Sequence, residues 1–161
     1  MLALRPFRAA DREEIRSWPP YPPAFAELDY ALRDGGWIDE YGSRPGTDVF
    51  IAADGDAIVG FSLLEREPEL AAEFRIAVHP EQLGQGLGRR IALLTLARGF
   101  SDPAIGTIRL IVRKNNPRAE RLYQSLGFRR TGECMRDVHG KPVAFYCMAI
   151  SREQFRQENP S

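Results

Sequence analysis

The chain has 161 residues, enough for one domain with a substantial core. Its 22 basic and 22 acidic side chains balance, so it lacks the basic footprint of a protein that binds nucleic acid. No run approaches the roughly 18 apolar residues that span a membrane, and the N-terminus lacks the organisation of a signal peptide. We therefore expect a cytoplasmic protein without nucleic-acid or membrane partners.

The N-terminal third predicts one strand and two helices. Pro6 indicates an edge strand, because proline within a sheet is tolerated mainly at an edge. Asp11 and Glu14 form a capping-box-like pair before a helix. The expected elements are a strand at residues 2–8, a short helix through Ile15 and Trp18, a helix at 24–33 that ends at Gly35-Gly36, and a loop at 37–47.

The rest of the chain predicts strands, two helices and a final hairpin. Asp54-Gly55-Asp56 marks a turn between two strands. Asn116 and Pro117 suit the cap and first turn of a helix, and Gly127 suits its end. The expected elements are strands at 49–53, 57–65, 73–78 and 107–113, helices at 89–98 and 117–126, a hairpin at about 129–150 that turns at His139-Gly140, and a loose polar tail at 152–161.

This order predicts an α/β (α+β) fold, a mixed, mostly antiparallel sheet of about seven strands flanked by about four helices, in a single domain of residues 1–151. The hairpin turn would put Cys134 opposite Phe145 and Arg136 opposite Val143. Cys147 would then be diagonal to Cys134, at roughly 7 Å between Cβ atoms, which is too far for a disulfide. Two cysteines and two scattered histidines also offer no spacing for a metal site.

One stretch is typical of a phosphate site. After the strand that ends near Pro80, the chain turns through Gly84, Gly86 and Gly88 and opens a helix, whose first N–H groups lack partners. The dinucleotide fingerprint fails because Arg89 stands where its third glycine belongs, and no Gly-Lys-Ser/Thr follows for a triphosphate loop. The alternative is an ordinary strand-to-helix turn.

This stretch resembles the acetyl-coenzyme A loop of the GNAT superfamily of N-acyltransferases, written Arg/Gln-x-x-Gly-x-Gly/Ala after Val-x-Pro. Gly86 and Gly88 match its small positions, whereas Leu83 occupies the usual Arg/Gln position. Residues 116–128 look like the other hallmark of that superfamily, Asn-x-x-Ala-x-x-Leu-Tyr-x-x-x-Gly-Phe, at every position. The resemblance covers about residues 49–150.

The resemblance implies a splayed pair of strands, the fourth and fifth, that receives the pantetheine arm of the coenzyme. Amides near Ala77 and Val78 would polarise the thioester, and Tyr123 would be the general acid. Glu73 lies where many members carry a Glu that holds a water relay for the base. The residues that the resemblance places at the coenzyme are Ile76, Ala77, Val78, Leu83, Gly84, Gln85, Gly86, Leu87, Gly88, Arg89, Asn116, Ala119 and Tyr123.

Simpler interpretations exist for both catalytic residues: Tyr123 as a core aromatic and Glu73 as a solvated carboxylate on a strand. In the ribosomal-protein N-terminal acetylases a comparable Glu lies in a Leu-Glu-Val-Arg sequence. Here residues 110–113 are Leu-Ile-Val-Arg, which argues against that subfamily.

The resemblance assigns recognition of the acceptor to the N-terminal third. Tyr21, Tyr30 and Trp37 there are either walls for the acceptor or parts of a small local core. Acidic residues of the same segment suit a cationic amine, although exposed charges need no such reason. These are Glu27, Asp29, Asp34, Asp39 and Glu40.

The sequence therefore predicts an N-acetyltransferase that moves an acetyl group from acetyl-CoA, its co-substrate, to a primary amine of a small molecule or peptide, by direct attack in a ternary complex. No metal is expected, and a homodimer is possible. Two alternatives remain: a catalytically idle acyl-CoA-binding regulatory module, and an N-acyltransferase that uses a longer acyl-CoA.

Overall fold

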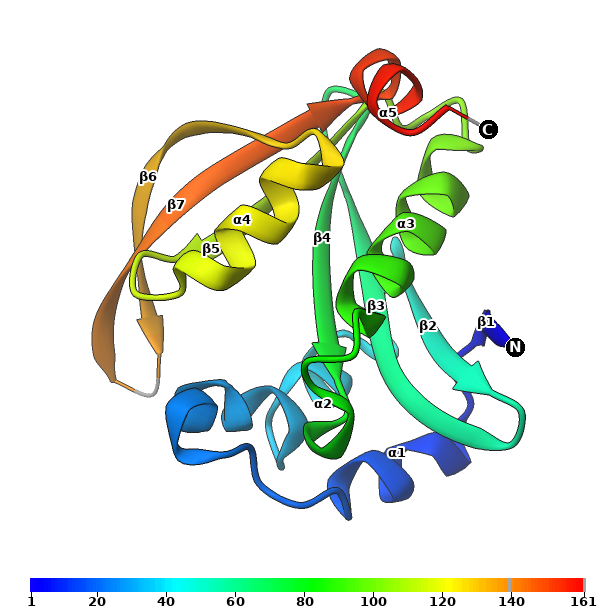
Figure 1. Cartoon of the computed structure of the whole chain (residues 1–161), viewed down its shortest axis with the longest axis vertical. Coiled ribbons are helices and arrows are strands. Elements are labelled where there is room, and N and C mark those ends of the chain that lie inside the picture. The colour runs from blue at the N-terminus through cyan, green and yellow to red at the C-terminus, as the bar shows by residue number, and fades with distance from the viewer. Residues whose placement is uncertain (139, 161) are drawn as a thin grey trace. The chain divides into compact units, whose positions relative to one another are not determined.

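The computed structural model of the chain (Figure 1) describes residues 1–138 and 140–160. Its residues form two compact units: unit 1 contains residues 1–65 and 75–97, and unit 2 contains residues 66–74 and 98–161. Seven strands form one sheet in the order β1-β2-β3-β4-β5-β7-β6. The pairs β1–β2, β2–β3, β5–β7 and β6–β7 are antiparallel, and β4–β5 is parallel. The predicted fold class is confirmed.

The described residues contain five α-helices and two 3-10 helices besides the strands. The strands are β1 (Leu2–Pro6), β2 (Thr47–Asp54), β3 (Ala57–Glu67), β4 (Ala71–Val78), β5 (Thr107–Arg113), β6 (Arg129–Val138) and β7 (Lys141–Ser151). The helices are α1 (Ala9–Arg16), η1 (Pro23–Leu32), α2 (Trp37–Tyr41), η2 (Pro80–Gln82), α3 (Leu87–Phe100), α4 (Pro117–Leu126) and α5 (Arg152–Glu158). None of these helices is both long and apolar enough to cross a membrane.

The register that β4 and β5 share is short. The parallel register of β4 and β5 covers only Ala71–Glu73 against Thr107–Arg109. Both strands continue beyond it, β4 to Val78 and β5 to Arg113. Later residues of β4 therefore lie outside the register that these two strands share.

The N-terminal third differs from expectation in three places. The second helix is the 3-10 helix η1, which follows Pro19, Pro20 and Pro22 and begins at Pro23. The amide of Phe25 donates a hydrogen bond to the carbonyl of Pro22, three residues earlier, as in a 3-10 helix. The predicted loop contains α2, because Ile38 and Tyr41 are buried on one side of it. Asp11 is not the cap of α1: it lies in the first turn and accepts hydrogen bonds from the backbone of Arg8 and from Arg5.

The C-terminal segment expected to be a loose tail forms α5. Ser151 accepts a hydrogen bond from the Gln154 amide, and the Gln154 side chain accepts one from the Ser151 amide. Arg152 donates to the carbonyls of Phe100 (3.1 Å), Asp102 (2.9 Å) and Ile105. One arginine therefore ties α5 to the end of α3, within unit 2.

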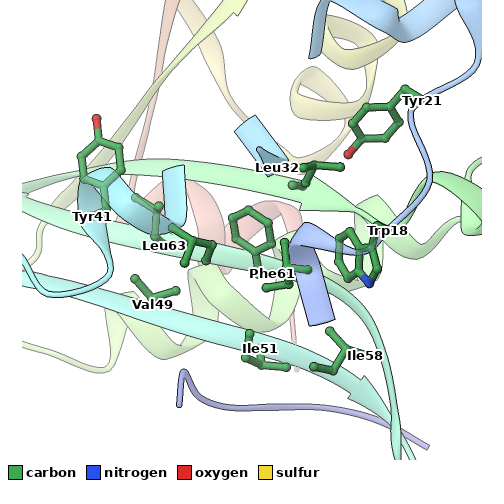
Figure 2. Close-up of a cluster of buried hydrophobic side chains, with 12 residues drawn as sticks. Trp18, Tyr21, Leu32, Tyr41, Val49, Ile51, Ile58, Phe61 and Leu63 are labelled. Carbon is green, nitrogen blue, oxygen red and sulfur yellow. The ribbon is translucent and has the colours of Figure 1, made fainter. Parts of the chain in front are cut away.

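Unit 1 has an apolar cluster between β2, β3 and the N-terminal helices. Phe61 lies in its middle, between Leu63 on one side and Trp18 on the other, and Tyr21 lies at its edge (Figure 2). A second cluster lies on the opposite face, where Leu87 and Ile91 of α3 pack on the sheet (Figure 1). Together the two clusters hold the beginning of α3 and the end of β4.

Unit 2 is built on β5, β7 and β6, and α4 lies across β5 and β7 (Figure 1). The predicted capping of α4 is confirmed: the Asn116 side chain accepts from the Ala119 amide at 3.2 Å, and Gly127 ends the helix at φ 111°. The predicted pairs Cys134–Phe145 and Arg136–Val143 are also confirmed. His139 of the hairpin turn lies outside the described residues.

Gly60 generates a prediction about stability. A Cβ atom there would lie 2.8 Å from the Ala77 carbonyl oxygen and 2.8 Å from Cδ1 of Ile91, so Gly60→Ala should lower the free energy of unfolding by about 1–3 kcal/mol. Urea unfolding measures this value. Gly132→Ala is the control, because a Cβ atom at Gly132 of β6 meets nothing within 4 Å. Equal stability of the two variants would contradict the prediction.

Candidate active site

The turn from β4 to α3 is built by glycines with positive φ, at 79° for Gly84 and 76° for Gly86. A Cβ atom at Gly86 would meet no protein atom within 4 Å, so this position faces open space. α3 begins at the buried Leu87, and Gly88 lies inside its first turn. The loop therefore presents exposed backbone beside the amides at a helix N-terminus, an arrangement suited to an anion.

Two hydrogen bonds fix the strand end that leads into this turn. The Tyr21 hydroxyl donates to the Val78 carbonyl at 2.8 Å, and the His79 amide donates to the Val59 carbonyl at 2.8 Å. Nδ1 of His79 accepts from the Glu81 amide at 3.0 Å, so η2 is also capped. Burial raises the pKa of Tyr21, which keeps its phenol protonated as the donor.

The side chains around this turn are mostly committed to packing. Leu83 packs against the same apolar cluster as Ala77, whereas Ile76 and Val78 pack against the cluster that contains Leu87. The side chains of Gln85 and Arg89 are exposed. Of the predicted coenzyme residues in this stretch, the apolar ones can therefore offer a ligand mainly their backbone groups.

Tyr123 lies on α4 in unit 2, together with Asn116 and Ala119. Its ring makes edge contacts with Phe74 of β4 (6.3 Å between centroids) and with Phe128 (5.9 Å). Burial raises the pKa of Tyr123 to about 12. No described group hydrogen-bonds with its hydroxyl, whereas the Tyr21 hydroxyl has a partner. Tyr123 is therefore a phenol that stays protonated and can donate.

Glu73 precedes Phe74 in β4 and lies opposite Arg109 of β5 in the register of the two strands. Adjacent residues of a strand point to opposite faces, so Glu73 and the Tyr123 ring lie on opposite sides of β4. Burial raises the pKa of the Cys147 thiol, with smaller contributions from a hydrogen bond with Cys134 and from the charge of Glu73. Both cysteines are free thiols.

The predicted acceptor residues divide into two groups. Tyr30 and Trp37 are both half-buried, and their rings meet edge to face at 6.1 Å. Trp37 also makes an edge contact with Phe61 at 6.4 Å. Tyr21 is buried, with its hydroxyl engaged by Val78. Tyr30 and Trp37 can contact a ligand, while Tyr21 supports the strand end.

The acidic side chains of the same segment have arginine partners. Asp29 accepts two hydrogen bonds from Arg33, both 3.0 Å, and Asp39 accepts two from Arg16, both 2.8 Å. The Gly35 amide and Arg16 hold the pKa of the Asp39 carboxyl below its ordinary value. Asp34 pairs with Arg16 at 3.0 Å, and Glu40 with Arg44 at 3.6 Å. The side chain of Glu27 lies outside the described residues.

Arg75 of β4 is a residue of this region that the sequence argument missed. Its guanidinium carbon lies 5.4 Å from the centroid of Trp37 and 5.2 Å from that of Tyr41. Strand alternation could have pointed to it, because residue 75 shares a face with Ala77, which belongs to the cluster beneath the N-terminal helices. Nothing local in the sequence marks the aromatic contacts.

No group of three or more His, Cys, Asp or Glu side chains that could hold a metal occurs in the described part of the chain.

Comparisons with known proteins bear on this geometry. Residues 10–128 match the family model described as Acetyltransferase (GNAT) family. Spermidine N(1)-acetyltransferase of Escherichia coli (strain K12) is 36% identical over 90 residues, which cover 55% of this chain and 48% of that protein. N-alpha-acetyltransferase RimI of Mycobacterium tuberculosis is 34% identical over 116 residues, covering 70% of this chain and 64% of that protein. The chain spans about half the length of the spermidine acetyltransferase that it matches.

Solved structures share the fold. A spermidine N-acetyltransferase SpeG chimera from Vibrio cholerae and hSSAT superposes with a TM-score of 0.77 at 21% identity, covering 97% of this chain and 98% of that one. The Vibrio cholerae spermidine N-acetyltransferase in complex with CoA and spermine has a TM-score of 0.72 at 23% identity, covering 96% and 97%.

Proposed function

The chain belongs to the GNAT acetyltransferase family, and we propose that it is an N-acetyltransferase that uses acetyl-CoA as co-substrate. Its acceptor is a primary amine of a small molecule or peptide. The family match over residues 10–128 supports this proposal, because it includes both the glycine turn and the whole of α4.

The residues of the glycine turn fit the coenzyme. The open space at Gly86 gives a pyrophosphate close access to backbone, and the first amides of α3 supply donors for its oxygens. Leu83 replaces the polar side chain usual in this loop, but it packs inward, so recognition there falls to backbone. The amides near Ala77 and Val78 are proposed to bind the pantetheine arm and to polarise the thioester carbonyl.

Acetyl-CoA supplies the thioester whose carbonyl carbon the amine attacks. An alkylammonium has a pKa of about 10, so a base must take its proton near neutral pH. Glu73 fills this role, directly or through water. Tyr123 gives its proton to the departing sulfur.

The single observation that carries the proposal is the Tyr123 phenol. Tyr123 lies on α4, whose N-terminus is capped by Asn116, and its side chain is half-buried. Its hydroxyl is protonated and has no hydrogen-bond partner among the described residues. The test is an assay of thiol release from acetyl-CoA with a panel of amines. Amine-dependent release of CoA supports the enzyme. Binding of acetyl-CoA without release under any amine would instead favour an idle binding module, and release only from longer acyl-CoA would favour an acyltransferase of that type.

Gly86→Glu should abolish binding of acetyl-CoA, because a side chain and a negative charge would enter the space proposed for the pyrophosphate. Calorimetric titration measures the affinity. Gly55→Glu is the matched control, since Gly55 also has positive φ (64°) and open space around a Cβ atom, but lies in the β2–β3 turn. If Gly86→Glu folds and binds as well as this control does, the loop is not the coenzyme site.

Glu73→Gln should lower kcat/KM near neutral pH by ~10²-fold, the usual contribution of general acid–base catalysis. The loss should shrink as the pH approaches the pKa of the amine, because the free amine then needs no base. A pH profile of both proteins measures this. Full activity of the variant near neutral pH would move the base to another group.

Tyr123→Phe keeps the ring and its contacts with Phe74 and Phe128 but removes the hydroxyl. Turnover should fall by roughly 10²-fold, while stability and affinity for acetyl-CoA change little. Because burial raises the pKa of Tyr123 to about 12, the phenol keeps its proton well above neutral pH. Wild-type turnover should therefore show no loss from ionisation of Tyr123 between neutral pH and about pH 10. An unimpaired Tyr123→Phe enzyme would leave Tyr123 as a core aromatic.

A further inference from the structure

The peptide group between Val78 and His79 is held at both ends within unit 1. The His79 amide donates to the Val59 carbonyl of β3 at 2.8 Å, and the Val78 carbonyl accepts from the Tyr21 hydroxyl at 2.8 Å. Because the carbonyl and the amide of one trans peptide group point in opposite directions, the Val78 carbonyl faces away from β3. The Tyr21 hydroxyl therefore lies at the edge of β4 that is opposite β3.

The preceding peptide group brings the Val78 amide to the same edge. The Ala77 carbonyl faces β3, because its oxygen lies 2.8 Å from the place where a Cβ atom of Gly60 would be. The Val78 amide is the other end of that planar group, so it points away from β3. The register that β4 shares with β5 on this side covers only Ala71–Glu73. The Val78 amide and the Tyr21 hydroxyl are therefore neighbours at one edge of the strand end.

Tyr21 is itself held firmly for this contact. Its side chain is 8% exposed in the apolar cluster of unit 1, at the end of the cluster opposite Tyr41 (Figure 2). Its backbone amide donates to Asp29 at 3.4 Å, and Asp29 accepts two hydrogen bonds from Arg33. Burial raises the pKa of Tyr21, so the hydroxyl keeps the proton that it donates. The Val78 carbonyl therefore has a donor that is fixed in place.

We propose that Tyr21 is a positioning residue for acetyl transfer: by holding the Val78 carbonyl, it keeps the Val78 amide aimed at the oxygen of the thioester carbonyl. A donor for the developing oxyanion is most effective when it is preorganised, since it then costs no reorganisation at the moment of reaction. Rotation about the backbone bonds of Val78 would turn its amide, and the Tyr21 hydrogen bond restricts that rotation. Tyr21 acts in this way on the acetyl donor and does not contact the amine. This inference rests on the proposed acetyltransferase function.

The first experiment observes the thioester directly. Acetyl-CoA with an isotope label at its carbonyl carbon is bound without an amine, and infrared difference spectra record the C=O stretching frequency. The wild type should lower this frequency relative to free acetyl-CoA, because a hydrogen bond to the oxygen weakens the C=O bond. Tyr21→Phe, which keeps the ring in the cluster, should lose part of this shift.

Two outcomes of these spectra would overturn the proposal. One is an unchanged shift in Tyr21→Phe. The other is a frequency in the wild type equal to that of free acetyl-CoA, a result that needs no variant and so does not depend on the folding of Tyr21→Phe.

The second experiment separates a positioning role from contact with the acceptor. Tyr21→Phe should lower kcat by roughly 10-fold, less than the loss of an oxyanion donor itself, because the Val78 amide remains but is less well aimed. The KM for the amine should change little, and the loss should be the same for every amine of the panel. A loss that appears in KM and differs between amines would make Tyr21 an acceptor residue and contradict the proposal.

Tyr41→Phe is the matched control, since Tyr41 is buried in the same cluster but lies at its other end (Figure 2). This variant should keep the wild-type frequency shift and kcat, and urea unfolding shows whether both variants are folded. An equal loss of the shift in folded Tyr41→Phe would trace the effect to the cluster as a whole and overturn the assignment to Tyr21.

The spectra also separate this inference from the proposed function, because they need no acetyl transfer. A shift that depends on Tyr21, without transfer to any amine, supports the positioning of the Val78 amide and counts against the enzyme. Transfer without any shift leaves the enzyme an acetyltransferase and overturns the positioning role.

Discussion

The candidate site depends on how the end of β4 is held. The Tyr21 hydroxyl bonds to the Val78 carbonyl, and the His79 amide bonds to the Val59 carbonyl, so the backbone is fixed at two consecutive residues. The backbone direction at the start of the glycine turn is therefore fixed. α3 begins at Leu87, whose side chain packs into its apolar cluster. Without these contacts the positive φ of Gly84 and Gly86 would give a flexible loop rather than a preformed turn.

Elements with strong local features could be predicted from sequence almost to the residue. β5 agrees at both ends, and α4 does so because Asn116 and Gly127 act through their own short-range chemistry. α2 and η1 could not be predicted in this way. α2 has five residues, too few for propensity alone, and is held by burial of Ile38 and Tyr41. The capping box at Ser151 is a local sequence pattern from which the start of α5 could be predicted. The hydrogen bonds of Arg152 that hold α5 in place could not, because their carbonyl acceptors lie about fifty residues earlier in the chain.

The same division applies to the site. The conformations of the glycine turn and of the helix that carries Tyr123 were predictable because each is a contiguous motif, set by glycine backbone freedom or by helix spacing. The state of the acidic residues was not, since nothing in the sequence says that Asp39 meets Arg16, which lies 23 residues away. The environment of Arg75 was also hidden, because Trp37 and Tyr41 reach it only through the tertiary structure. Local chemistry indicated the glycine turn and α4, whereas tertiary packing determines which acidic side chains of the N-terminal third are paired.

This difference has a physical origin. Backbone amides recognise phosphate whatever side chains surround them, so a turn with Leu83 in place of a polar residue can keep the same ligand. Side chains recognise an acceptor through charge, shape and stacking, and replacing one of them changes which amine is preferred. Membership of the family therefore supports acetyl-CoA much more strongly than it supports any particular amine. The acceptor therefore has to be inferred from this chain's own side-chain contacts.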